Sequence, residues 1–337
     1  TGKPGNFTSN CPAATGTYLL EFGLLSELSG DTSYIDTAMK AMTFLYNKSK
    51  STNYLVGLEI DVETGKWLNP LSVVGAGIDS YYEYMLKYAL VSGDQTTYTM
   101  WLNALESIKK YVIDHWGFLR IHDIQTTTHL PLSRIDSLAA FLPGLLTLHG
   151  DIPLAESVWD VYYTLYKRFK VIPEWFEFWD KRGTAPHFLR PEFGESTYYL
   201  YRATKKPIYR QLAIQYIDDL YGCCKSKCGF SALDNSSDNQ SKSGKMDSFF
   251  LAETLKYLYL ILDDQHWIHD APIIFTTEAH PMFVSEKASG LRATCTRYER
   301  DIVLKRDYTR DERRLVVADL IHGTVPSLDY LKIWDHS

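Results

Sequence analysis

The chain has 337 residues, enough for one or two domains with a large buried core. Its 45% hydrophobic content excludes a disordered chain. Lys and Arg number 35 against 41 Asp and Glu, so the net charge of −6 leaves no basic surface for a nucleic-acid backbone and favours neutral substrates.

An apolar-periodic stretch, a short turn and a second periodic stretch recur along the chain, which predicts a repeat of helical hairpins. In three hairpins the turn contains Gly-Asp, at Gly30-Asp31, Gly93-Asp94 and Gly150-Asp151. Glycine supplies the left-handed residue that ends the first helix of each pair. The predicted pairs are 19–28 with 33–46, 80–91 with 98–113, 138–148 with 155–169, 195–203 with 208–221, and a fifth that opens with 248–262.

Helical hairpins cannot bury their apolar faces singly, so they stack as a superhelix or close as a ring. The first helices are nearly apolar, as in 18–25, and are expected to form an inner ring. The second helices carry more charge, such as Glu106 and Lys109, and are expected to form an outer, solvated ring. A closed ring would gather the segments that lead into its inner helices at one mouth, where polar residues matter most.

Four Asn-x-Ser/Thr sequons favour a protein of the secretory pathway, although single sequons also arise by chance. Their acceptors are Asn6, Asn47, Asn235 and Asn239, and the last two lie in a Ser/Asn/Asp-rich stretch that predicts an exposed loop. The five cysteines are Cys11, Cys223, Cys224, Cys228 and Cys295. Their odd number leaves at least one unpaired or bonded outside the chain, and their spacing favours disulfide use over a zinc site.

Asp79 and Glu83 are four residues apart at the start of a predicted inner helix, so they share a helix face. We expect both to point into the ring as candidate catalytic or binding carboxylates. The structural alternative is that Asp79 caps its helix and Glu83 pairs with Lys87.

Arg190, Glu192 and Glu195 stand within six residues, in a proline-stiffened segment before another inner helix. Three charges between apolar runs need partners. A salt bridge from Arg190 to one glutamate would still leave the other carboxylate unexplained.

Glu253 interrupts an apolar helix four residues after Phe249. A ring that stacks on a sugar face beside a carboxylate explains both residues, and a core position explains Phe249 equally well. After this helix, Thr277 and Glu278 offer oxygen ligands that suit calcium, although 275–281 also fits an ordinary turn. Carboxylates that converge in an aromatic pocket indicate glycoside hydrolysis.

Five segments together resemble glycoside hydrolase family 47, the class I α-1,2-mannosidases; they are 78–84, 141–144, 189–192, 248–259 and 277–281. The resemblance implies an all-α fold, an (α/α)7 barrel of helical hairpins. It also implies inverting removal of terminal α-1,2-linked mannose from N-glycans, with one bound Ca2+. The family's barrel starts about two hairpins before Leu19, so we expect its N-terminal hairpins to be missing from this chain. Residues 1–281 are then the C-terminal part of the catalytic barrel, and 282–337 a charged linker or the start of a further region.

Carried over residue by residue, the resemblance makes Glu192 the general base and Asp79 the acid, while Thr277 binds the metal. Arg190 lies beside the base and Phe249 stacks on the sugar. The carboxylates expected around the ion and the sugar are Glu83, Glu195, Glu253 and Glu278. The assignment requires Asp79, Glu192, Glu253 and Thr277 to meet in one cavity.

Within the family, the segment 75–79 is more similar to the endoplasmic-reticulum (ER) degradation-enhancing mannosidase-like proteins than to the processing mannosidases. Gly77 stands where the processing enzyme has arginine, and Ser137 stands where a histidine occurs. The subgroup implies an ER-lumenal protein that trims misfolded glycoproteins for degradation, with a protein disulfide isomerase as partner in fungal members. A mannose-binding receptor without turnover is the alternative. A terpene-cyclase toroid would need an Asp-rich motif that 262–265 does not supply.

Overall fold

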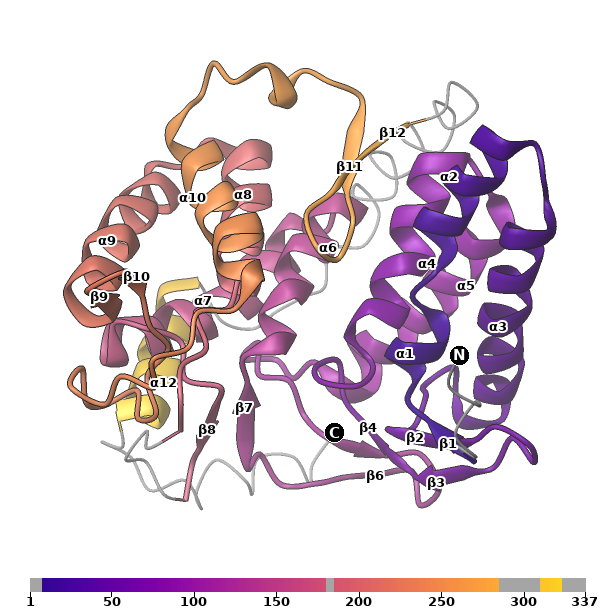
Figure 1. Ribbon diagram of the computed structural model, residues 1–337. Coiled ribbons are helices and arrows are strands. Elements are labelled where there is room, and N and C mark those ends of the chain that lie inside the picture. The colour runs from indigo at the N-terminus through magenta and orange to yellow at the C-terminus, as the bar shows by residue number, and fades with distance from the viewer. Residues whose placement is uncertain (1–7, 180–184, 285–309, 323–337) are drawn as a thin grey trace. The chain divides into compact units, whose positions relative to one another are not determined.

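The structure, a computed structural model, describes residues 8–179, 185–284 and 310–322 (Figure 1). The chain divides into two compact units. The first comprises 1–114, 120–130 and 272–294, and the second comprises 115–119, 131–271 and 295–337. No helix in the described ranges is both long and apolar enough to cross a membrane.

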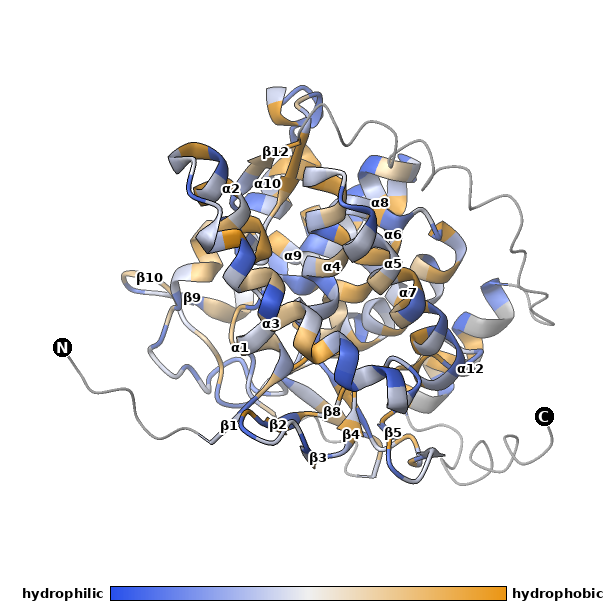
Figure 2. Cartoon of the chain, turned by 90° about the vertical axis from the view of Figure 1, so that its right-hand side faces the viewer, coloured by the Kyte–Doolittle hydropathy of each residue, from blue (hydrophilic) through white to orange (hydrophobic). Residues whose placement is uncertain are grey.

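Two helical hairpins form the body of the first unit and confirm the first two predicted pairs (Figure 1). They are α2 (Leu19–Ser29) with α3 (Ser33–Ser49), and α4 (Asp79–Ser92) with α5 (Gln95–Ser107), which continues as a π-helical turn at Ile108–Val112. Helix α3 carries both hydrophilic and hydrophobic residues (Figure 2), and its buried Ala38, Met42 and Leu45 recur at helical spacing.

Short elements complete the first unit: α1 (Pro12–Gly16), a 3₁₀ turn at Lys50–Thr52 and three small antiparallel sheets. The strands are β1 (Ser9–Asn10), β2 (Glu59–Asp61) and β3 (Trp67–Asn69); β4 (Leu71–Ser72), β5 (His122–Asp123) and β6 (Thr128–His129); and β11 (Ile273–Phe275) with β12 (Pro281–Phe283). The β11–β12 hairpin packs against α4.

The second unit contains the remaining predicted helices. They are α6 (Leu142–His149) after a 3₁₀ turn at Leu138–Phe141, α7 (Ile152–Phe169), α8 (Glu192–Thr204), α9 (Pro207–Cys224) and α10 (Leu255–Leu262) after a π-helical turn at Phe250–Thr254. A 3₁₀ turn at Trp267–His269 and the two-stranded pairs β7 (Arg134–Asp136) with β8 (Trp175–Glu177), and β9 (Lys225–Ser226) with β10 (Gly229–Phe230), complete it.

The Gly-Asp turns behave as the sequence predicts. Gly30, Gly93 and Gly150 end their helices with φ of 74°, 80° and 108°, the left-handed region that glycine enters without strain. Asp94 and Asp151 then cap the next helices, because each side chain accepts a hydrogen bond from the backbone N–H three residues later.

Helices α6 and α8 approach closely because small residues face each other. A Cβ added at Gly144 would lie 3.0 Å from Tyr199 and 3.2 Å from Ser196. The Ser196 hydroxyl accepts a hydrogen bond from the Gly144 N–H (2.8 Å) and donates one to the Ala140 carbonyl (2.5 Å). This contact fixes the position of the helix that begins at Glu192.

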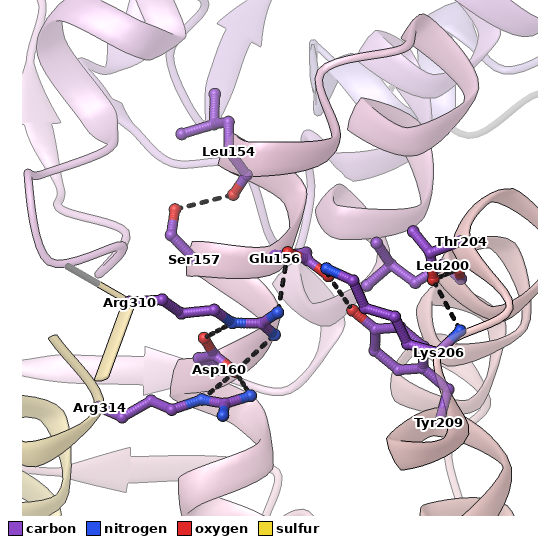
Figure 3. Close-up of polar contacts among 10 residues, drawn as sticks. All are labelled: Leu154, Glu156, Ser157, Asp160, Leu200, Thr204, Lys206, Tyr209, Arg310 and Arg314. Carbon is purple, nitrogen blue, oxygen red and sulfur yellow. Dashed lines mark hydrogen bonds and ion pairs between the residues drawn. The ribbon is translucent and has the colours of Figure 1, made fainter. Parts of the chain in front are cut away.

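Helix α7 differs from the expected outer, solvated helix. Most of its residues are buried, because α12 (Arg310–His322) packs against it in addition to α6 and α8. Arg310 and Arg314 both pair with Asp160 of α7, and Arg310 also pairs with Glu156 (Figure 3). Of the charged run after residue 297, the part before Arg310 lies outside the described residues, and the part from Arg310 onward belongs to a docked helix.

Candidate functional site

The second unit brings five of the expected site residues together. Arg190 and Glu192 stand at the start of α8, and Glu195 follows one turn later. Glu253 lies in the π-helical turn that packs against α8. Phe249 immediately precedes that turn, and its ring centroid is 5.7 Å from the Arg190 guanidinium carbon. Three carboxylates, a cation and an aromatic ring therefore share one location.

Glu192 has the properties of a functional carboxylate. Its Oε2 atom is sealed from solvent and has no hydrogen-bond partner among the described residues. Burial raises the pKa of Glu192 well above its usual value, the Arg190 charge opposes this, and Glu253 and Glu195 add to the increase. A buried carboxyl with a perturbed pKa is a typical acid or base of an active site.

Arg190 forms a salt bridge, but its partner lies outside the 190–195 segment. Its Nε and Nη2 donate to the two carboxylate oxygens of Glu174, at 2.6 and 2.5 Å. The interpretation that Arg190 pairs with a glutamate of its own segment is therefore wrong. Sequence reasoning missed Glu174; a lone carboxylate among apolar residues at 171–176 is the signal that could have identified it.

The backbone beside this cluster is strained. Leu189 is fully buried and has φ of 61°, a value that a bulky side chain rarely adopts. Its carbonyl accepts a hydrogen bond from Thr254 Oγ1 (2.7 Å), at the end of the π-helical turn. Strained backbone and π-helical turns both concentrate at functional sites.

The first unit holds the other expected site residues. Asp79 is the first residue of α4 and is half-buried. Its Oδ1 accepts a hydrogen bond from the Ser80 N–H (2.8 Å), while the N-cap position belongs to Ile78. Asp79 therefore satisfies one N–H of the first turn, as a capping side chain does, but from the first helical position and not from the N-cap position.

Glu83 is buried in α4 and pairs with Lys87, with 2.5 Å between Oε1 and Nζ. The i+4 pairing raised as the structural alternative is thus present. The pair offsets the cost of burying the Glu83 charge and holds its carboxylate in place.

Thr277 and Glu278 lie at the tip of the β11–β12 hairpin, where Thr277 is half-exposed and Glu278 is exposed. Among the described residues, neither oxygen of Thr277 takes part in a hydrogen bond. Ala279 has φ of 56° and is buried, so the tip is held in one conformation. Hard oxygens that are not used in hydrogen bonds are the donor type that Ca2+ prefers. The described residues contain no group of three or more His, Cys, Asp or Glu that could hold a metal ion.

The described sequon asparagines are exposed or half-buried, whereas the described cysteines range from buried to exposed. Asn47 is exposed on α3, Asn239 is exposed and Asn235 half-buried in the loop before α10, and Asn6 lies outside the described residues. The described cysteines are free, with Cys224 buried and Cys228 exposed, while Cys295 lies outside the described ranges.

A sequence model of glycosyl hydrolase family 47 matches residues 2–284. The chain belongs to glycosyl hydrolase family 47. The family 47 assignment agrees with the fold, because the solved α-1,2-mannosidase from Trichoderma reesei superimposes with a TM-score of 0.74 at 24% identity. That match covers 83% of this chain and 67% of the solved one, and it confirms the all-α fold of the α/α-barrel class.

Curated family 47 relatives are longer than this chain. ER degradation-enhancing alpha-mannosidase-like protein 1 of Schizosaccharomyces pombe is 36% identical over 90% of this chain and 39% of its own length. The human protein 3 of that name is 39% identical over 84% of this chain and 31% of its own length. The chain thus spans about a third of the length of these relatives.

Proposed function

We propose that this chain is part of the catalytic domain of an α-1,2-mannosidase of the ER degradation-enhancing type. The substrate is terminal α-1,2-linked mannose on N-glycans of misfolded glycoproteins, and trimming marks them for degradation. The family and the printed names of the relatives support the substrate class. The single observation that carries the proposal is the buried, unpartnered Glu192 Oε2 beside Arg190, Glu195 and Glu253.

In the proposed inverting reaction, Glu192 activates the water that attacks the anomeric carbon, and Asp79 supplies the proton to the departing oxygen. Phe249 offers a flat apolar face for a hexose, and the Arg190 cation beside it stabilises the ionised Glu192. Glu195, Glu253, Glu83 and Glu278 are proposed to bind sugar hydroxyls. For Glu83, the ion pair with Lys87 fixes the carboxylate that would do so.

Calcium belongs to the proposal through Thr277, whose hydroxyl and carbonyl oxygens would hold the ion. A bound Ca2+ supplies a fixed positive charge that orients sugar hydroxyls. The hydrogen bonds that close the hairpin tip, from Ala279 N–H to the Thr276 carbonyl and from Thr276 N–H to the His280 carbonyl, keep the Thr277 oxygens in place.

A receptor that binds mannose glycans without turnover is the second candidate. The raised pKa of Glu192 favours it, because a protonated carboxyl cannot act as a base. The two candidates use the same residues and differ only in whether the bond is cleaved.

The test uses the full-length protein that carries this chain, with Man9 and Man8 glycans on folded and unfolded carrier, with and without chelator. Wild type is expected to release mannose, and Glu192→Gln to release about 10²- to 10⁴-fold less while glycan affinity is retained. Glu177→Gln, a carboxylate on β8 outside the cluster, is the matched control. Absence of release from wild type with intact glycan binding would support the receptor, and unchanged release from Glu192→Gln would contradict the role of Glu192.

We further propose an ER-lumenal location, with glycans on Asn6, Asn47, Asn235 and Asn239. A protein disulfide isomerase is proposed as partner through an unpaired cysteine, for which Cys228 is exposed. The expected complex is disulfide-linked, so it survives non-reducing electrophoresis and is released by reductant. Its loss in Cys228→Ser, but not in Cys224→Ser, would support this partner.

Additional N-terminal hairpins of the same catalytic domain are proposed to cover α2. The exposed Leu24, Leu25 and Leu28 of that helix support this proposal. Reduced hydrogen exchange of α2 in the full-length protein, relative to this chain alone, would test it.

A further inference from the structure

Glu174 is held in place from several directions. Its Oε2 accepts a hydrogen bond from Ser137 Oγ (3.2 Å), and its backbone carbonyl accepts one from Ser137 N–H (3.0 Å). Its own N–H donates to the Pro186 carbonyl (2.7 Å). The Glu174 carboxylate, which accepts the hydrogen bonds from Arg190, is therefore held in place by contacts with Ser137 and Pro186.

The bond from Arg190 to Glu174 is a two-point contact between a planar guanidinium and a planar carboxylate. Such pairs define orientation as well as distance, because both planes must align. The guanidinium carbon lies 5.7 Å from the Phe249 ring centroid and 5.8 Å from that of Phe188. Without an acceptor, a long arginine side chain explores other rotamers and leaves both rings.

The backbone that carries Arg190 is also fixed, since Leu189 is buried at φ of 61° and bonded to Thr254. The side chain of Arg190 is thus held at its base by Leu189 and at its head by Glu174. A group fixed at both ends can present its charge without reorganisation when a ligand arrives.

We propose that Glu174 is a positioning residue, which holds the Arg190 guanidinium against Phe249 and beside Glu192 so that a bound hexose meets a fixed cation next to the reacting carboxylate. This inference rests on the proposed mannosidase function. Glu174 acts through Arg190 and is not itself assigned a contact with the sugar.

Loss of the Glu174 charge can shift the pKa of Glu192 in either direction. The direction shows whether Arg190 has stayed in place or moved. If Arg190 stays in place, removal of a nearby negative charge lowers the pKa of Glu192. If Arg190 moves away, loss of the stabilising cation raises it. The other titratable groups that interact with Glu174, Arg190 or Glu192 include His187, Glu195, Glu253, Asp136, Tyr162 and Tyr216.

The test measures mannose release by the full-length protein in Glu174→Gln, Arg190→Lys and the double variant, with Glu177→Gln as control. We expect Glu174→Gln to reduce kcat about 10- to 100-fold, as for a misplaced group. The acid limb of kcat/KM should move to higher pH, and the double variant should be no slower than Arg190→Lys. The control should stay within about twofold of wild type. A crystal structure of Glu174→Gln should show Arg190 displaced from Phe249.

A merely structural role would lower the melting temperature and add to the effect of Arg190→Lys without moving the acid limb. Such a purely structural effect would overturn the inference. So would an acid limb of kcat/KM that moves to lower pH, or a crystal structure in which Arg190 has not moved. Failure of the proposed function is recognised separately, because wild type itself would then release no mannose.

Discussion

Lys87 and Glu83 form an ion pair within α4, with 2.5 Å between Nζ and Oε1. Both are buried, since only 1% of the surface of Lys87 and 3% of that of Glu83 is exposed. A buried charge is tolerated only when its partner is present. Lys87→Met should therefore destabilise the first unit by about 3–5 kcal/mol, because Glu83 is left buried and unpaired. Urea denaturation of the full-length protein, followed by hydrogen exchange of α4 amides, measures the loss. Lys40→Met, on an exposed site of α3, should change the stability by less than about 0.5 kcal/mol. Equal effects of the two substitutions would contradict the buried pair.

Asp160 connects α12 to α7 through four hydrogen bonds from Arg310 and Arg314, of 2.9 to 3.1 Å (Figure 3). Asp160→Asn removes the charge and should weaken the docking of α12 by about 1.5–3 kcal/mol. Hydrogen exchange at 317–321 is the measurement, and it should accelerate in the variant. Asp218→Asn, an exposed carboxylate on α9, is the control and should leave exchange in α12 unchanged. Unaltered protection in Asp160→Asn would show that apolar contacts of Val317 and Ile321 suffice.

His187 couples stability to pH. It is completely buried, its Nδ1 lies 2.7 Å from the Ile172 carbonyl, and burial lowers its pKa to about 4. The folded state therefore keeps the imidazole neutral while the unfolded state gains a proton below about pH 6.5. Stability should fall by about 3 kcal/mol between pH 6.5 and 4, and His187→Gln should lack this component. Urea unfolding at several pH values measures the slope, with the exposed His322→Gln as control. A slope equal to that of wild type in His187→Gln would refute the assignment.

Glu192 should cost stability in the absence of ligand. Its folded pKa is raised, so its contribution to stability is full below the unfolded pKa and is lost as the pH rises through the folded pKa. Glu192→Gln should therefore be more stable than wild type at neutral pH and equal to it at strongly acidic pH. Thermal melts at both pH values check this sign. A destabilised Glu192→Gln at neutral pH would show that the charge is better accommodated than its burial indicates.

The sequence alone determined the helical hairpins and the position of the site segment. Apolar periodicity, the Gly-Asp turns and the capping residues are local features. Each lies within about one helical turn of the helix or helix end that it specifies. For the same reason, the cluster of Arg190, Glu192 and Glu195 was recognisable from one short segment.

Only the tertiary structure decided the partners. Arg190 pairs with Glu174, which is 16 residues away, rather than with the glutamates beside it. Helix α7 is not solvated as an outer helix would be, because α12, about 150 residues later, packs against it and pairs Arg310 and Arg314 with Asp160. The sequence shows that a charged side chain between apolar segments needs a partner. Which residue becomes that partner depends on how distant segments of the chain pack together.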